Sequence, residues 1–299
     1  MIINEQAIDL TFRGFKTLYT DAFTAAPVQY NKIAMAVPSS ARNEAYGWLG
    51  QFPQLREWLD GEREVKNLTA HGFTIENRKF ESTVSVNRDD FSDDRLGVFR
   101  PMVSEMGHRA RQHPDELVFA MLASGFASLC YDGQNFFDTD HPAKDASGNT
   151  ITVSNMADGA EQPWFLMDAT RPIKPIIWQE REKYEFTRVN RHDDDQVFMT
   201  DTYKFGIRAR VNVGFGLWQF AFGSKQPLTS DTYAAARAEM MKLRGNEGRI
   251  MGIDPSTLVV GPDLEGVASA IVNSEVNDGG GSNPWKGTAD LIVSPYIGA

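Results

Sequence analysis

A thirteen-residue stretch, residues 130–142, gathers side chains of the types that bind metals and transfer protons. It reads CYDGQNFFDTDHP and holds the only cysteine of the chain, three carboxylates and one of the five histidines. Asp138, Asp140 and His141 offer oxygen and nitrogen atoms of the kind that coordinate divalent metals. A metal-dependent hydrolase that uses these three residues is therefore one hypothesis for the function.

The spacing within this stretch matches no established metal or catalytic motif. HExxH is absent, and the twelve-residue calcium loop would need a glycine at its sixth position and a terminal glutamate. Asp-Thr-Asp-His-Pro is also typical of a tight turn, in which aspartate bonds to nearby backbone and proline stiffens the exit. Cys130 follows an apolar segment, which favours a small buried side chain over a nucleophile. We therefore expect turn chemistry here, with no metal ligand.

No other segment predicts catalysis or cofactor binding. Gly214-Phe-Gly216 lacks the GxGxxG spacing, the glycines at 279–281 lack the Lys-Ser/Thr of a P-loop, and GxSxG is absent. His108 and His113 lie among arginines, which favours a solvated helix end. The sequence thus predicts a protein without catalytic residues and without a cofactor.

Composition and charge exclude several classes of protein. The 299 residues carry 40 acidic and 30 basic side chains, a formal net charge of -10, whereas a grip on nucleic acid needs clustered basic residues. One cysteine cannot form an internal disulfide. The apolar run at 117–123 is far shorter than the ~20 residues of a membrane span, and the N-terminus does not read as a secretory signal. We expect a soluble protein, made in the cytosol, with no membrane partner.

Hydrophobic periodicity predicts an α+β fold with helices early, strands in the middle and an α/β unit at the end. Residues 25–40 lack periodicity and read as an extended arm outside the core. The helical and strand segments that we expect are a helix over 5–23, a helix over about 102–110, a second helix that opens at Pro114, strands within 164–222, a helix capped at Thr229, a strand at 256–262, a helix over 263–272 and a last strand after 289.

Residues 44–90 predict a projecting loop. Phe80, Val84 and Val86 alternate with polar residues, and with Phe73 and Ile75 they read as a β-hairpin or as a long loop with two ribbon-like arms. A hairpin alone is marginal in water, so something must cover the large apolar side chains of this loop. Composition alone favours the core of the parent domain.

Several ordered stretches resemble one family, the major head subunits of Mu-like tailed phages, which are capsid proteins of the Hong Kong 97 type. No one motif is specific, but the ordered set spans nearly the whole chain. The matching stretches include YGWLG at 46–50, FESTVSV at 80–86, HPDELVF at 113–119, CYDGQNFFDTDHP at 130–142, RPIKP at 171–175 and SNPWKG at 282–287.

The resemblance implies a Hong Kong 97-type major capsid fold and a division of the chain. Residues 1–43 would form an N-terminal arm and 44–90 an extended loop that reaches over the adjacent subunit. Residues 91–219 would form a peripheral domain with a spine helix and β segments, and 220–299 mainly an axial domain. In this arrangement the loop packs on the next copy, which reverses the preference drawn from composition. The inter-subunit contact residues would be Tyr46, Trp48, Phe52, Leu55, Trp58 and Phe80.

The resemblance also implies a function in assembly. The chain would be a major capsid protein that self-assembles into pentamers and hexamers of an icosahedral shell around double-stranded DNA, with only weak non-specific contact to that DNA. Its partners would be further copies of itself, a separate scaffolding protein, a portal protein and a decoration protein. It would reside in the virion, and in the host bacterial cytoplasm during assembly. A cellular nanocompartment shell of the same fold is the related alternative.

Overall fold

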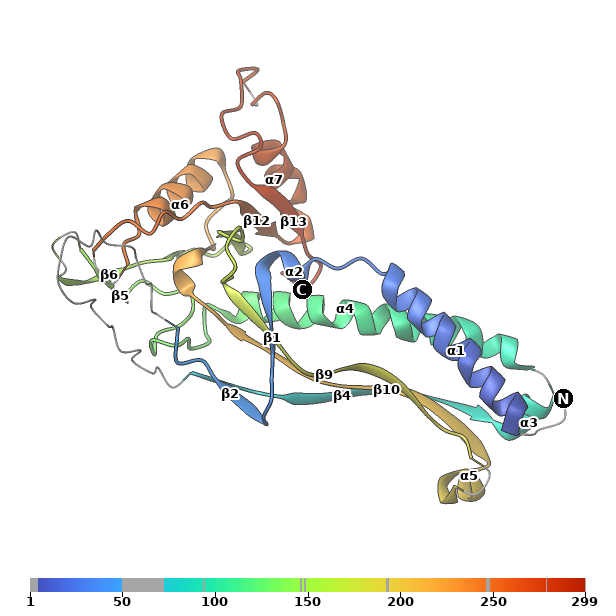
Figure 1. The fold of residues 1–299 in the computed structure, drawn as a ribbon. Helices are drawn as coiled ribbons and strands as arrows, with labels where there is room; N and C mark the ends of the chain where they lie inside the picture. The colour runs from blue at the N-terminus through green and yellow to red at the C-terminus, as the bar shows by residue number, and fades with distance from the viewer. Residues whose placement is uncertain are drawn as a thin grey trace, which may run out of the picture.

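The computed structural model describes residues 5–49 and 73–298, apart from positions 94, 146, 148, 192, 193, 246, 247 and 278. The described chain is elongated (Figure 1), with a long sheet and two helices toward one end and a second sheet at the other. Two long strands dominate the first sheet, and short strands build the second.

The long sheet has four strands in the order β1-β9-β10-β4. Strands β9 and β10 run antiparallel over fourteen residues each, β4 pairs antiparallel with β10, and β1 pairs parallel with β9. One face of this sheet is apolar because alternate side chains of a strand point to the same side. The strands are β1 (Ala34–Pro38), β4 (Arg78–Asn87), β9 (Ile176–Val189) and β10 (Thr202–Phe215).

Two long helices cover the apolar face of the long sheet. Helix α1 (Glu5–Ala25) lies across α4 (Arg100–Ser124), and both rest on the strands (Figure 1). The close crossing of the helices depends on Gly107, since a Cβ there would lie 2.4 Å from the backbone oxygen of Tyr19. A side chain at this position would force the helices apart.

The second sheet has five strands in the order β13-β12-β8-β11-β7, with α6 (Ser230–Lys242) and α7 (Glu265–Val272) beside it. Strands β8, β11 and β12 are buried along their whole length. Strands buried on both faces read as continuous apolar runs, as WFLM and TLVV do here. The strands are β7 (Met156–Ala157), β8 (Trp164–Met167), β11 (Ala221–Ser224), β12 (Thr257–Val260) and β13 (Asp290–Val293).

Two short antiparallel pairs and several one-turn helices complete the described chain. The pairs are β2 (Asn43–Ala45) with β3 (Thr74–Glu76) and β5 (His141–Lys144) with β6 (Thr150–Val153). The short helices are α2 (Tyr30–Ile33), α3 (Arg88–Ser92) and α5 (Asp195–Thr200), and the 3₁₀ turns are η1 (Arg95–Phe99), η2 (Trp218–Phe220) and η3 (Pro262–Leu264). None of the described helices is long and apolar enough to cross a membrane.

The structure confirms the helix at the N-terminus, the β-rich middle and the α/β unit at the end. Thr229 caps α6 with a reciprocal capping box: its hydroxyl accepts from the N–H of Thr232, and the Thr232 hydroxyl accepts from the N–H of Thr229. The prediction of two helices between 102 and 124 is wrong. Pro114 lies inside one continuous helix, α4, so it does not open a second one.

The prediction that residues 25–40 form an arm outside the core is also wrong. Strand β1 joins the long sheet, and Ile33 and Ala34 are buried. The carboxylate of Asp115 on α4 accepts hydrogen bonds from the N–H groups of Gln29 (3.0 Å) and Tyr30 (2.7 Å). Parallel pairing and this buried carboxylate hold a segment whose own sequence lacks periodicity.

The two strand segments of the predicted hairpin do not pair with each other. Residues 74–76 form β3 and pair with β2, whereas 78–87 form β4 and pair with β10. The alternating pattern identified the strand correctly, but tertiary packing decides which strand it pairs with. The actual ribbon at the base of the loop is therefore β2 with β3.

Candidate functional site

The connection that follows α4 folds around one buried carboxylate, that of Asp132. It accepts hydrogen bonds from His141 Nδ1 (2.8 Å), from Cys130 Sγ (3.0 Å) and from the backbone N–H of Gln134 (3.1 Å). The His141 side chain is fully buried and that of Asp132 is only 6% exposed. Burial by itself raises the pKa of Asp132, but the hydrogen bonds from His141 and Cys130 outweigh it, and the pKa is lowered.

The hydrogen bonds of this cluster stabilise the fold. Burial, with Asp132 beside it, raises the pKa of the Cys130 thiol far above its usual range, so the nucleophilic thiolate does not form near neutral pH. The His141 ring stacks on the Trp218 indole with 4.0 Å between ring centroids. Asp132 thus joins the cysteine and the histidine to the core, and a sequence search centred on Asp138 missed it.

The ligand atoms of Cys130, Asp132 and His141 all lie within 4.8 Å of one another, so this cluster gathers the types of atom that bind metals. A histidine that binds a metal through one ring nitrogen usually donates its other N–H to an acceptor. Nε2 of His141 is buried and has no hydrogen-bond partner among the described residues. In this structure the Asp132 carboxylate accepts hydrogen bonds from the His141 ring and from the Cys130 thiol, and the raised pKa of that thiol keeps it protonated near neutral pH.

The residues of the hydrolase hypothesis do not converge on a metal position. The Asp138 carboxylate accepts hydrogen bonds from the backbone N–H groups of Asn135 (3.2 Å) and Thr139 (2.7 Å). Asp140 is exposed, and His141 bonds to Asp132. The prediction of turn chemistry is confirmed for Asp138, which accepts from neighbouring backbone N–H groups, but it is wrong for His141 and Pro142, which lie in strand β5.

Phe136 and Phe137 anchor the same connection. Both are fully buried, and the Phe136 ring stacks on Phe215 with 4.3 Å between centroids, while Phe137 lies 5.3 Å from the Phe165 ring. The connection therefore ties the end of α4 to both sheets. A segment whose residue types suggested reactivity is thus anchored in the core by two fully buried rings.

The described part of the predicted contact loop begins inside the molecule. Tyr46 is buried, and its hydroxyl donates to Oε1 of the buried Gln179 on β9 (2.7 Å). The assignment of Tyr46 to an inter-subunit contact is corrected, because its ring belongs to the core of its own chain. Trp48 is half-buried and packs against the same cluster. Phe52, Leu55 and Trp58 lie outside the described residues.

Phe80 lies at an apolar groove between β4 and α4. The groove has a volume of about 630 Å³, and Phe80 lies edge-on to His113 with 4.3 Å between ring centroids. His113 bonds through Nδ1 to the Tyr184 hydroxyl (2.5 Å), and burial lowers its pKa. The prediction of a solvated His113 is therefore wrong. The apolar lining includes Phe80, Val84, Met102, Met106, Ile207 and Ala209.

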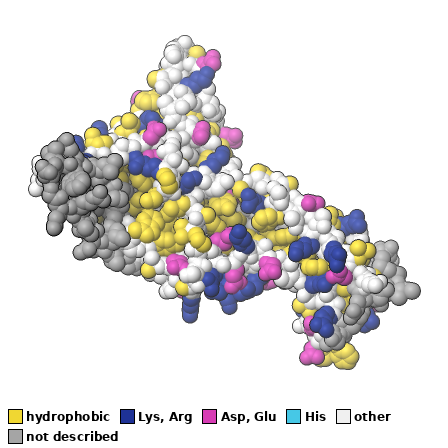
Figure 2. All heavy atoms as spheres, in the orientation of Figure 1, with side chains coloured by type: hydrophobic (Ala, Val, Ile, Leu, Met, Phe, Trp, Pro, Cys, Tyr) yellow, Lys and Arg dark blue, Asp and Glu magenta, His cyan; other side chains and the backbone are white. Residues whose placement is uncertain are grey.

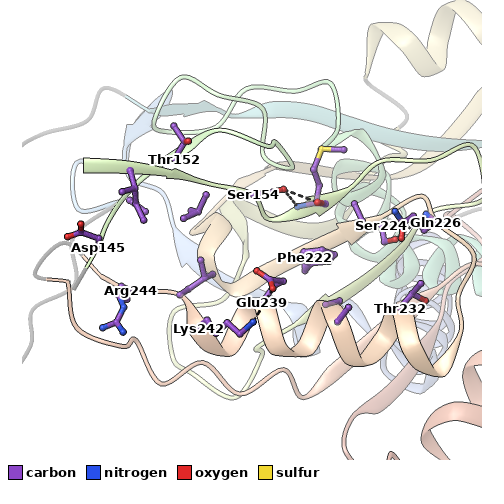
Figure 3. Close-up of a pocket in the computed structure, with 18 of the residues that line it drawn as sticks. Asp145, Thr152, Ser154, Phe222, Ser224, Gln226, Thr232, Glu239, Lys242 and Arg244 are labelled. Carbon is purple, nitrogen blue, oxygen red and sulfur yellow. Dashed lines mark hydrogen bonds and ion pairs between the residues drawn. The ribbon is translucent and has the colours of Figure 1, made fainter. Parts of the chain in front are cut away.

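A second hollow of about 780 Å³ lies between the β5–β6 pair and α6 (Figure 3). Its floor includes Phe222 on β11, and its rim carries charges of both signs. On the rim, Lys242 pairs with Glu239 at 3.3 Å, and Ser154 bonds to the backbone of Met156.

Comparison with known proteins places these surfaces in context. Residues 8–297 match the family model described as "Mu-like prophage major head subunit gpT". The chain is 40% identical to the major capsid protein of Escherichia phage Mu, over 99% of this chain and 100% of that protein. It is 37% identical to the Mu-like prophage FluMu major head subunit of Haemophilus influenzae, over 99% of both chains.

Solved structures agree with the sequence comparison. A chain of the procapsid of bacteriophage JBD30 is 42% identical, covers 99% of this chain and 100% of its own, and superposes with a TM-score of 0.87. A chain of the JBD30 capsid is 32% identical, covers 93% of both chains, and has a TM-score of 0.78. The predicted α+β capsid fold is thereby confirmed.

Proposed function

Since the chain belongs to the family of Mu-like prophage major head subunits, we propose that it forms pentamers and hexamers that close into an icosahedral shell around double-stranded DNA. Like the members of its family, the chain is a structural capsid protein and not an enzyme. The single observation that carries the proposal is the near-complete overlap with a procapsid subunit at a TM-score of 0.87.

The likeness to a procapsid subunit supports assembly in two stages. Solved JBD30 structures include a procapsid, a capsid and a capsid decorated with minor capsid protein trimers. We infer a precursor shell in the host bacterial cytoplasm, built with a separate scaffolding protein and a portal protein, and a decoration protein that joins the virion. The net charge of -10 favours only weak contact with packaged DNA.

The domain division keeps the predicted limits, with two elements reassigned: strand β1, although within 1–43, pairs with β9 in the peripheral sheet, and β4 also belongs to that sheet. We propose residues 1–43 as the N-terminal arm, 44–90 as the extended loop, 91–219 as the peripheral domain and 220–299 as mainly the axial domain. Strand β4, although within 44–90, is part of the peripheral sheet because its whole length pairs with β10.

The contact surface of the extended loop is proposed from its anchored base. Gln179 bonds to Tyr46 and donates to the backbone oxygen of Ile75 (3.1 Å), so the two ends of the loop are held together on β9. We propose that Trp48, Phe52, Leu55, Trp58 and Phe80 contact the neighbouring copy. Large aromatic anchors are the side chains that most often dominate such contacts.

Electron microscopy and sedimentation of the purified full chain, alone and with co-expressed scaffolding protein, test this function. We expect rings and closed shells. A strictly monomeric product under both conditions would contradict the proposal. Replacement of Asp138, Asp140 and His141 by alanine serves as a second test: loss of a metal-dependent activity with unchanged shells would favour a hydrolase. Shells that enclose protein cargo and no DNA in infected cells would favour a nanocompartment.

A further inference from the structure

The described base of the extended loop, defined here as residues 43–49 and 73–77, packs against the core of its own chain. Strands β2 and β3 pair over only three residues each, and a two-stranded ribbon is marginal by itself in water. Tyr46, Leu49 and Ile75 of the base are buried. Apolar burial is non-directional, so it does not by itself fix how the base is turned on the sheet. The orientation of the base therefore depends on its hydrogen bonds.

One buried side-chain amide, that of Gln179 on β9, bonds to both ends of the loop. Its Oε1 accepts from the Tyr46 hydroxyl (2.7 Å), and its Nε2 donates to the backbone oxygen of Ile75 (3.1 Å) and to Oδ1 of Asn77 (2.9 Å). The side chain is fully buried. A glutamine amide has two N–H donors and one carbonyl, and all of them are used here to hold the loop base.

Asn77 extends this network to the end of β1. Its Nδ2 donates to the Ser39 hydroxyl (2.8 Å) and to the backbone oxygen of Ala41 (2.9 Å). The backbone N–H of Ser39 donates in turn to the carbonyl of Glu180 on β9 (2.9 Å). Ser39 and Asn77 are both buried. A buried network of this kind resists rearrangement, because any shift leaves a buried polar group without a partner.

Strand β10 holds the returning end of the loop beside Gln179. Asn212 lies directly opposite Gln179 in the β9–β10 ladder, and its Nδ2 donates to the backbone oxygen of Glu76 (2.6 Å). Two residues further on, Gly214 leaves room for Ile75, since a Cβ there would lie 2.2 Å from the Ile75 Cδ1. Side chains of two adjacent strands thus define one seat for β3.

Surface charges contribute less to this seat than the buried amides. The ion pair between Arg42 and Glu76 (2.7 Å) joins the two strands of the base, but both side chains are mostly exposed. Charged side chains of both signs are spread over the face of the molecule that Figure 2 shows. Exposed ion pairs add little stability because water and salt screen them.

We propose that Gln179 is a positioning residue for assembly, which fixes the orientation of the loop base relative to the long sheet. The inference rests on the proposed function, in which the extended loop contacts a neighbouring copy, and it deepens that function by naming the side chain that aims the contact. Because both ends of the loop bond to one amide on β9, the base turns together with the long sheet as a unit. An error in its direction would be repeated at every copy of a closed shell.

The first experiment separates positioning from stability. Gln179→Met keeps the length of the side chain, removes its three hydrogen bonds and leaves the buried Tyr46 hydroxyl without its acceptor, so we expect a lower unfolding temperature. Adding Tyr46→Phe removes that hydroxyl and should recover part of the lost stability. We expect closed shells of the double variant, counted by electron microscopy per folded subunit, to stay about tenfold below wild type because each misdirected contact is repeated. Recovery of shells in step with stability would overturn the proposal.

Val103→Ala is the matched control for a general loss of stability. Val103 is fully buried on α4 and does not belong to the network. At a temperature where this variant is folded, we expect closed shells at the wild-type yield. A loss of shells as large as that of the double variant would show that destabilisation alone prevents closure, and would refute the role of Gln179.

A second experiment measures the loop base in free subunits by hydrogen exchange. In Gln179→Met/Tyr46→Phe, backbone amides within 43–46 and 74–77 should exchange about tenfold faster, while those of Val118 and Leu122 on α4 keep their protection. Unchanged exchange at the base would contradict the inference whether or not shells form. Faster exchange at the base, together with failure of the wild type to form rings or shells, would instead contradict the proposed function.

Discussion

Two hydrophobic clusters of unequal kind stabilise the molecule. The larger one draws buried side chains from both sheets, from the connection after α4, and from α6 and α7, with three fully buried tryptophans: Trp164, Trp178 and Trp218. The smaller one lies between α1, the first half of α4 and the outer halves of β4, β9 and β10. The larger cluster is built from many segments of the chain, whereas the smaller one depends on α1 and the first half of α4 laid over one face of a sheet.

Helix α4 belongs to both clusters, and Pro114 stands where they divide. Val103, Met106 and Ala110 face the smaller cluster, and Val118, Phe119 and Leu122 face the larger one. Proline has no N–H and cannot make the helical bond to the carbonyl four residues earlier. The β9–β10 ladder is irregular near the same level, with register shifts between Arg208 and Val211. The two clusters are therefore joined by elements whose hydrogen bonding is interrupted at the junction.

Loss of one buried aromatic ring should give the largest difference in stability between the two clusters. Phe136→Ala removes a fully buried ring from the larger cluster, and we expect it to lower the free energy of unfolding by about 3–5 kcal/mol. Phe205→Ala removes a similarly buried ring from the smaller cluster, where α1 can shift to fill part of the cavity, so its cost should be lower. Urea unfolding measures both. Equal losses would show that the two clusters are equally rigid.

Removal of the central carboxylate should have the next largest effect. Asp132→Ala leaves the buried His141 and Cys130 without their acceptor, and we expect a loss of about 2–3 kcal/mol at neutral pH. Because the pKa of Asp132 is lowered in the folded state, its stabilisation is complete above the unfolded pKa of ~3.9 and is lost as the pH falls through the folded pKa.

The pH series distinguishes the charge of Asp132 from a packing defect. Urea unfolding of the wild type and of Asp132→Ala at stepped pH values, from neutral to about 3, should show the difference between them shrinking below pH ~4. Thr139→Ala, in the same connection but exposed, is the control. A difference that stays constant with pH would mean that the ionised carboxylate does not contribute.

A substitution at the crossing of α1 and α4 should have the next largest effect on stability. Gly107→Ala places a Cβ against the backbone of α1, with Tyr19 O at 2.4 Å and the Ala22 Cβ at 3.2 Å, and we expect a cost of about 1–3 kcal/mol. Hydrogen exchange should accelerate in α1 while the amides of β8 and β12 stay protected. Acceleration in both sheets would contradict the view that the smaller cluster can loosen alone.

The smallest effect should have the opposite sign. A Cβ at Gly14, inside α1, meets nothing within 4 Å. Gly14→Ala should therefore stabilise α1 by about 0.5–1 kcal/mol through the lower backbone entropy of the unfolded chain. Thermal unfolding of this variant, alone and combined with Gly107→Ala, measures it. A destabilised single variant would indicate an unseen neighbour at this position.

Elements with local signals were predicted well from the sequence. Thr229 capped its helix as expected, and the run at 256–262 became a buried strand. These features depend on a few neighbouring residues, so their patterns can be read directly. The prediction that a helix opens at Pro114 was wrong. Proline usually lies at a helix end, but packing on both sides of α4 keeps Pro114 inside that helix.

The amino-acid sequence by itself indicated the class of this protein. Its acidic net charge argued against tight binding of nucleic acid, its residues matched no familiar catalytic motif, and its ordered stretches resembled the capsid family. Tertiary structure alone decided which distant groups meet. Asp132 accepts hydrogen bonds from His141 and Cys130, and Gln179 bonds to both ends of the extended loop. Strand β4 pairs with β10 and not with β3. The physical reason is that periodicity records which face of an element is buried, whereas hydrogen-bond partners far apart in the chain leave no local pattern.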